Sequence, residues 1–168
     1  MALLEQIEWD GLTPAGLWRQ IDGDTREAAA RAVYKNSPGS SKAEADMLIA
    51  QAMRFRPTAI RKLPVEKRVQ YLLSRVPIDD NMASTMLMAL HLGPRADLLK
   101  GFLTALEIPH ENGLIDDNYD LQPQTTEQLK GAITSGYESF DREQFDLYLA
   151  ALVALDPETW GEIPSALG

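Results

Sequence analysis

Hydrophobic residues recur along this chain at spacings of three and four, and the strict alternation that is typical of a half-buried strand is almost absent. The clearest amphipathic segment follows Leu63 and Pro64. One face of a helix there carries Val65, Val69, Leu72, Leu73 and Val76, and the charged residues lie largely on the other faces. This periodicity predicts helices over most of the chain.

Residues 79–92 form a segment that is apolar on most sides of a helix. Three of the six methionines lie in it, together with leucines and alanines, and few polar positions remain. A helix that lacks a polar face is buried on most of its sides. We therefore expect the helix 79–92 at the centre of the fold.

Capping residues and prolines indicate where the helices begin. A Ser, Thr, Asp or Asn oxygen at the N-cap accepts a hydrogen bond from an amide of the first turn, and proline fits that turn. These signals predict helix starts at Thr13-Pro14, at Asp24 or Thr25, at Asp79-Asp80, at Thr125 or Thr126, and at Asp141. Ser41 and Glu44 have the spacing of a capping box.

Two segments depart from the regular amphipathic pattern. Residues 108–124 contain Pro109 and the turn signal Asn112-Gly113 but no helical periodicity, which predicts a long irregular loop. Residues 147–155 are apolar around the whole helix. Either this stretch is sandwiched between neighbouring helices or it exposes a stripe that binds another chain, and we expect burial.

The elements together predict an all-α, single-domain helical bundle of about seven or eight helices over residues 1–168. A short α-solenoid-like array of antiparallel helix pairs is the alternative architecture. We expect residues 1–12 to form a loosely packed N-terminal segment.

Charge is distributed unevenly along the sequence. The net charge of −9 opposes non-specific binding to nucleic acid or anionic membranes. Residues 1–78 hold 12 Lys and Arg against 9 Asp and Glu, whereas residues 79–168 hold 4 against 16. This polarity is the strongest functional signal in the composition.

The absence of cysteine excludes disulfides, thiolate metal sites and a cysteine nucleophile. The first residues lack the basic and apolar regions of a signal peptide, and the longest apolar run is too short to span a bilayer. We therefore expect a cytoplasmic protein that makes no membrane contact.

A calcium-loop pattern runs from Asp116 to Glu127. Asp116, Asn118, Asp120 and Glu127 fall at four of the ligand positions of a 12-residue loop. Leu121 replaces the glycine that such a loop needs, and no helix enters it. An acidic surface loop explains the same residues, and the sequence leaves open whether they bind a cation.

The two histidines do not form a recognisable metal site. Glu107 and His110 have the Glu-x-x-His spacing of di-iron bundles, but Pro109 interrupts the helix and no second copy occurs. His91 fits a hydrogen-bonded core position on the helix 79–92. Phosphate-loop, nucleophile-elbow and dinucleotide motifs are also missing, so we predict no catalytic residues and no cofactor.

A basic stretch with two interleaved aromatic residues, Phe55 and Tyr71, is the main positive feature. Its cationic residues are Arg54, Arg56, Arg61, Lys62, Lys67, Arg68 and Arg75, opposed only by Glu66. If several of them share a face, they form a site for phosphate groups or an acidic partner. The alternatives are that this stretch docks on the acidic C-terminal half, or that the charges only solvate helix surfaces.

These observations favour a non-catalytic protein–protein interaction or adaptor module whose partner is another protein. Phosphate or nucleic-acid binding through residues 54–75 is the alternative, although the net charge disfavours nucleic acid. An enzyme with an unrecognised active site is a third and weaker hypothesis. The charge polarity also allows head-to-tail self-association that weakens with salt.

Overall fold

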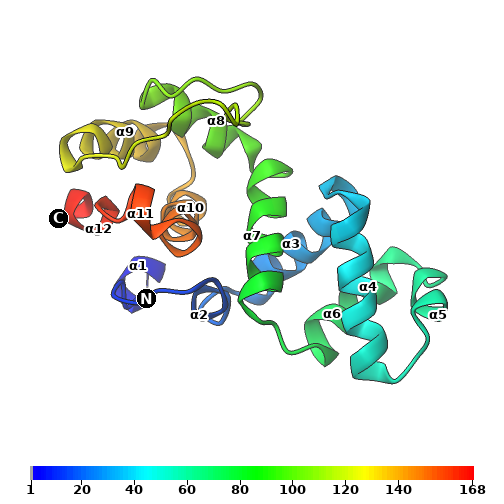
Figure 1. The fold of residues 1–168 in the computed structure, drawn as a ribbon. Coiled ribbons are helices and arrows are strands. Elements are labelled where there is room, and N and C mark those ends of the chain that lie inside the picture. The colour runs from blue at the N-terminus through cyan, green and yellow to red at the C-terminus, as the bar shows by residue number, and fades with distance from the viewer. Residues whose placement is uncertain (1) are drawn as a thin grey trace. The chain divides into compact units, whose positions relative to one another are not determined.

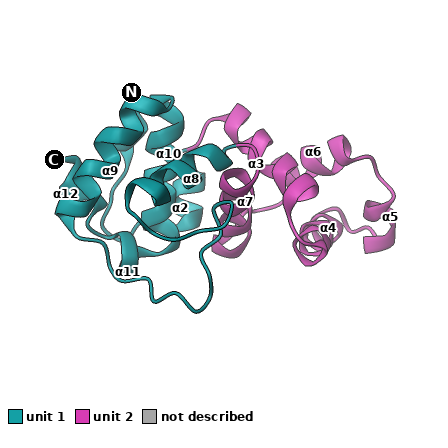
Figure 2. Ribbon diagram, turned by 90° about the horizontal axis from the view of Figure 1, so that it is seen from above, with its two compact units in different colours: residues 1–20, 95–168 teal, residues 21–94 magenta. Residues whose placement is uncertain are grey.

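The computed structural model describes residues 2–168, and its helices confirm the all-α prediction (Figure 1). Seven helices in this range have ten or more residues, and several short ones raise the total above the predicted seven or eight. The chain divides into two compact units, unit 1 (residues 1–20 and 95–168) and unit 2 (residues 21–94) (Figure 2). A single domain over residues 1–168 stays a prediction.

Unit 2 is built from five consecutive helices. They are α3 (Gly23–Asn36), α4 (Gly39–Met53), α5 (Pro57–Arg61), α6 (Val65–Arg75) and α7 (Asp80–Leu92). Helix α3 packs against both α6 and α7, and α4 packs against α5 and α6. Because α3 contacts helices that do not adjoin it in the sequence, these contacts favour a bundle over a linear array of helix pairs.

Helix α7 supplies much of the apolar interior of unit 2. Met82, Met86, Leu87 and Leu90 are fully buried, and α7 packs against α3, whose alanines are also largely buried. His91 is also buried, and its Nδ1 lies 2.9 Å from the Leu87 carbonyl oxygen, as expected for a core histidine. The burial is not complete around the helix, because Met88 and Leu92 remain exposed.

Unit 1 is arranged around α10 (Arg142–Leu155). The other helices of this unit are α1 (Leu3–Gln6), α2 (Pro14–Trp18), α8 (Ala96–Ala105), α9 (Thr126–Ser139), α11 (Pro157–Trp160) and α12 (Ile163–Leu167). Helices α1, α2, α8, α9 and α11 all contact α10. Residues 147–155 are consequently buried or half-buried, so the stretch that is apolar all round is sandwiched between neighbours as expected.

Aromatic side chains fill the core of unit 1. The Phe102 ring lies 5.9 Å from Phe145, 5.5 Å from Tyr148 and 5.9 Å from Trp160, measured between ring centroids. The N-terminal segment contributes as well, because Ile7 is buried and both Trp9 and Leu12 pack against this cluster.

Most of the predicted caps are present. Thr13, Asp79, Thr125 and Asp141 each accept a backbone amide of the helix that follows, and Thr125 forms a capping box with Gln128.

Two predicted helix starts are wrong by two or three residues. Helix α3 is capped by Asp22, whose carboxylate accepts the Thr25 amide, so Thr25 already lies in the first turn. Helix α4 begins after Pro38, and the amides of Ser41 and Lys42 bond to the Pro38 carbonyl. Ser41 therefore lies inside the helix, and no side chain caps this helix start.

Candidate functional site

The structure separates the seven cationic residues of the basic stretch into exposed and inward-facing ones. Six of them are exposed: Arg54, Arg56, Arg61, Lys62, Lys67 and Arg75. Arg68 is half-buried and takes part in a network inside unit 2. Only the exposed six are accessible to a partner.

Arg68 joins three helices of unit 2. Its guanidinium lies 3.5 Å from the Asp46 carboxylate and 5.6 Å from the centroid of the Tyr34 ring. Its Nε donates to the Leu63 carbonyl at 3.0 Å, and its Nη2 donates to the Arg61 carbonyl. Asp46 is buried, and Arg68 supplies the counter-charge that a carboxylate in the interior needs.

Tyr34 completes this network by donating its hydroxyl proton to Asp46 Oδ1 at 2.9 Å. Burial raises the pKa of the Tyr34 phenol, and the hydrogen bond to Asp46 raises it further. The hydroxyl therefore stays protonated at neutral pH and serves as a structural donor. The network links α3, α4 and α6, so Arg68 stabilises the fold of unit 2.

Four of the exposed cations lie at the end of α4 and at the two ends of the short helix α5. Arg54 ends α4, Arg56 is the N-cap of α5, and Arg61 and Lys62 lie at the end of α5. We call Arg54, Phe55, Arg56, Arg61 and Lys62 the basic corner. A five-residue helix is only about 8 Å long, so the four cationic residues are attached to the chain at or near the two ends of one short helix.

Local structure determines which side chains the basic corner presents. Ile60 is fully buried and anchors α5 against α4, which leaves the charged ends of α5 in solvent. Arg54 adopts a left-handed conformation with φ 58°, and the Phe55 amide bonds to the Ala50 carbonyl at 2.9 Å. This turn leaves Phe55 51% exposed between two arginines.

Substitution of Arg54 by glycine should stabilise unit 2, because glycine adopts positive φ without the steric cost that Arg54 bears. We expect a gain of about 0.5 kcal/mol after the greater flexibility of glycine in the unfolded chain is included. Urea denaturation followed by circular dichroism measures it. Arg56→Gly is the control, because Arg56 has φ −74° and loses the same charge without relief of strain. Equal effects of the two substitutions would show that charge, not backbone conformation, dominates.

The remaining exposed cations lie along α6. Lys67 sits 5.4 Å from the centroid of the Tyr71 ring, and Arg75 ends the helix. Glu66, the one acidic residue of the stretch, contacts Arg31 of α3 at 2.5 Å. Glu66 therefore pairs outside the basic stretch and does not neutralise the basic corner.

The charge asymmetry of the sequence follows the two compact units. Unit 2 holds 11 Lys and Arg against 8 Asp and Glu, and unit 1 holds 5 against 17. Their formal net charges are therefore +3 and −12. None of the four cations of the basic corner forms an ion pair with any residue in the range 2–168.

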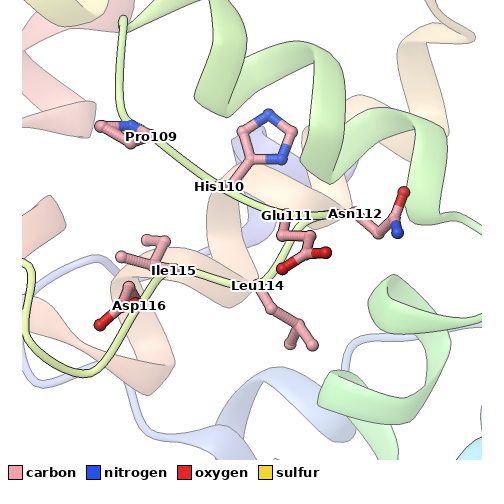
Figure 3. Close-up of a pocket in the computed structure, with 7 residues that line it drawn as sticks. All are labelled: Pro109, His110, Glu111, Asn112, Leu114, Ile115 and Asp116. Carbon is pink, nitrogen blue, oxygen red and sulfur yellow. The ribbon is translucent and has the colours of Figure 1, made fainter.

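A hollow of about 450 Å³ lies in unit 1, on the irregular segment between α8 and α9 (Figure 3). His110 lines it, but both ring nitrogens are engaged: Nδ1 accepts the Gly113 amide at 3.0 Å, and Nε2 lies 2.9 Å from Thr104 Oγ1. Since Nδ1 is an acceptor, Nε2 carries the proton and donates to Thr104. The ring holds the turn in place.

The loop from Asp116 to Glu127, for which the sequence left cation binding open, does not gather its acidic side chains around one point. Asp116 Oδ1 accepts the Asn118 amide at 2.8 Å, and Leu121 packs against the core of unit 1. Over residues 2–168, no three histidine, cysteine, aspartate or glutamate side chains come close enough to hold a metal ion together.

Sequence reasoning missed the two buried aspartates. Asp46 bonds to Tyr34, and Asp146 of α10 accepts the Tyr137 hydroxyl at 2.5 Å. Each lies among apolar positions of its own helix, and a carboxylate in such a stripe indicates a buried partner. That signal was present in the sequence, although it does not identify the partner.

Within residues 2–168, the longest apolar helix falls short of the length and hydropathy that a membrane span requires. The chain matches no protein-family model, and its comparison with curated proteins and with solved structures gave no match either.

Proposed function

We propose that this chain is a non-catalytic protein-interaction module that binds an acidic segment of another protein at the basic corner. The observation that carries the proposal is the arrangement of four exposed cations without intramolecular counter-charges around the half-exposed Phe55. Like charges grouped around one short helix repel each other, and carboxylates of a partner relieve that repulsion. Phe55 provides the apolar contact that specific interfaces place next to arginine.

The proposal limits the ligand to an acidic segment with at least one apolar side chain. The contact is small and its charges are solvated, so we expect modest affinity that falls as the salt concentration rises. Two side chains in this region have structural roles: Arg68 pairs with Asp46, and Ile60 is buried. Neither is part of the binding surface.

Binding of a fluorescein-labelled peptide of alternating Asp and Glu with one central Leu tests the proposal by fluorescence anisotropy. The corner-neutral variant carries Arg54→Gln, Arg56→Gln, Arg61→Gln and Lys62→Gln. If each exposed charge contributes about 0.5 kcal/mol, the loss of all four should lower the affinity roughly 30-fold. A charge-matched control carries Lys35→Gln, Lys42→Gln, Lys67→Gln and Arg75→Gln, and we expect it to lose only a few-fold.

Equal losses for the two variants would contradict the proposal, because binding would then follow net charge and not the basic corner. The same titration with a single-stranded oligonucleotide and with inorganic phosphate tests the alternative function. Tighter binding of the oligonucleotide than of the peptide, with a steep salt dependence, would replace the protein-interaction function with a phosphate-binding one.

A further inference from the structure

The loop between α8 and α9 presents apolar side chains to solvent in an acidic setting. Leu114 is 61% exposed and Tyr119 is 40% exposed. Exposed acids surround them in the sequence: Glu111, Asp116, Asp117 and Asp120. We call Glu111, Leu114, Asp116, Asp117, Tyr119 and Asp120 the acidic loop face.

The loop holds these side chains outward although it is firmly attached to unit 1. Ile108 is buried, and Ile115 and Leu121 pack against the core. At the far end the Gln124 amide bonds to the Thr159 carbonyl at 3.0 Å. Apolar residues of this loop thus alternate between anchors in the core and the exposed Leu114 and Tyr119.

A tight turn determines where Leu114 points. Asn112 and Gly113 have φ values of 52° and 88°, which are the angles of a type I′ turn, and Glu111 and Leu114 bond to each other across it. The His110 ring accepts the Gly113 amide from one side. Figure 3 shows the His110 ring and the Leu114 side chain on opposite sides of the loop.

We propose that the acidic loop face of one copy of this chain binds the basic corner of a second copy. This inference rests on the proposed function and identifies its partner. Four cations around Phe55 face four carboxylates around Leu114 and Tyr119, so both the charges and the apolar side chains are complementary. The two surfaces differ, so the contact is head-to-tail, and a dimer of two copies retains one free surface of each kind.

Sedimentation equilibrium of two complementary variants tests this arrangement. The corner-neutral variant lacks the basic corner but keeps the acidic loop face. A loop-neutral variant carries Glu111→Gln, Asp117→Asn and Asp120→Asn, and it keeps Asp116 because that carboxylate accepts the Asn118 amide. We expect each variant alone to sediment as a single chain of 18.6 kDa. Their equimolar mixture should form a dimer that grows no further, since each pair of variants holds one intact surface of each kind and the contact uses both.

The unmodified protein should form dimers and larger species at about 20 mM salt and return to single chains at about 300 mM, where charges are screened within several ångströms. A single-chain mass at both salt concentrations would overturn the inference, and so would a mixture of the variants that stays monomeric. If the chain is monomeric but the acidic peptide still binds the basic corner, the proposed function stands. Only the assignment of a second copy as the partner is then wrong. If the peptide does not bind either, the proposed function fails too.

Discussion

Replacement of Gly136 by alanine should destabilise unit 1 by about 3 kcal/mol, because the added methyl group has no space. Gly136 is buried in α9 against the Phe145 ring, where an added Cβ would lie 2.7 Å from Cε2 and closer still to Cζ and Cε1. Phe145 cannot move aside easily, since it is fully buried and contacts both Tyr137 and Phe102 edge-on. Helices α9 and α10 would have to separate.

Gly131 of the same helix provides the matched control. It is exposed, and nothing lies within 4 Å of an added Cβ. Gly131→Ala should therefore stabilise unit 1 by about 0.5–1 kcal/mol, the usual gain of alanine over glycine inside a helix. Urea denaturation followed by tryptophan fluorescence measures both, because Trp9, Trp18 and Trp160 all lie in unit 1. Similar effects of the two substitutions would contradict the close approach of α9 and α10.

Removal of the Asp46 carboxylate should have the other large effect, a loss of about 3 kcal/mol in the stability of unit 2. Asp46→Ala leaves the half-buried Arg68 without its counter-charge and Tyr34 without its acceptor. Both side chains are largely shielded from water, so water does not readily replace the hydrogen-bond acceptor that they lose. Hydrogen exchange of the amides in α3, α4 and α6 should accelerate by on the order of 100-fold.

The Arg31–Glu66 pair is the control for this prediction. Its atoms are closer, 2.5 Å against 3.5 Å for Arg68 and Asp46, but Glu66 is 69% exposed. Glu66→Ala should cost less than about 1 kcal/mol, since an exposed pair gains little over hydration. We therefore expect burial, and not the distance between the charged atoms, to determine which ion pair contributes more to stability. A larger loss for Glu66→Ala than for Asp46→Ala would contradict this expectation.

The helical fold could be predicted from the sequence where local chemistry determines it. Thr13, Asp79, Thr125 and Asp141 cap helices as predicted, because an N-cap acts only on the turn that follows. The short helix α5 was not predicted, since a segment of five residues that begins at Pro57 is too short to show a helical repeat of apolar positions. Its position depends on Ile60, which packs against α4.

The boundary between the units could not be read from the sequence. Residues 1–20 join residues 95–168 in unit 1 because α1 and α2 pack on α10. Periodicity shows that a helix has an apolar face but does not show which distant helix covers it. The uneven charge along the chain was visible, and its assignment to two compact units came from the structure.

The sequence showed the basic stretch as one group of cations, but it did not show which of them are exposed and which one faces the interior. Lys67 and Arg68 are adjacent in the sequence, yet Lys67 is exposed and Arg68 faces Asp46. The packing of α6 against α3 and α4 distinguishes the two residues. The clustering of Arg54, Arg56, Arg61 and Lys62 likewise depends on how the unpredicted α5 folds back on α4.

The most direct test of the central claim locates the bound peptide on the protein. Titration of the isotope-labelled chain with the same acidic peptide, followed by amide chemical shifts, reports each residue separately. We expect the largest shifts between Arg54 and Lys62, with Phe55 among them, and small shifts along α6 at Lys67 and Arg75. Shifts centred on α6, or weak shifts spread over every basic residue, would contradict the assignment of the basic corner as the binding surface.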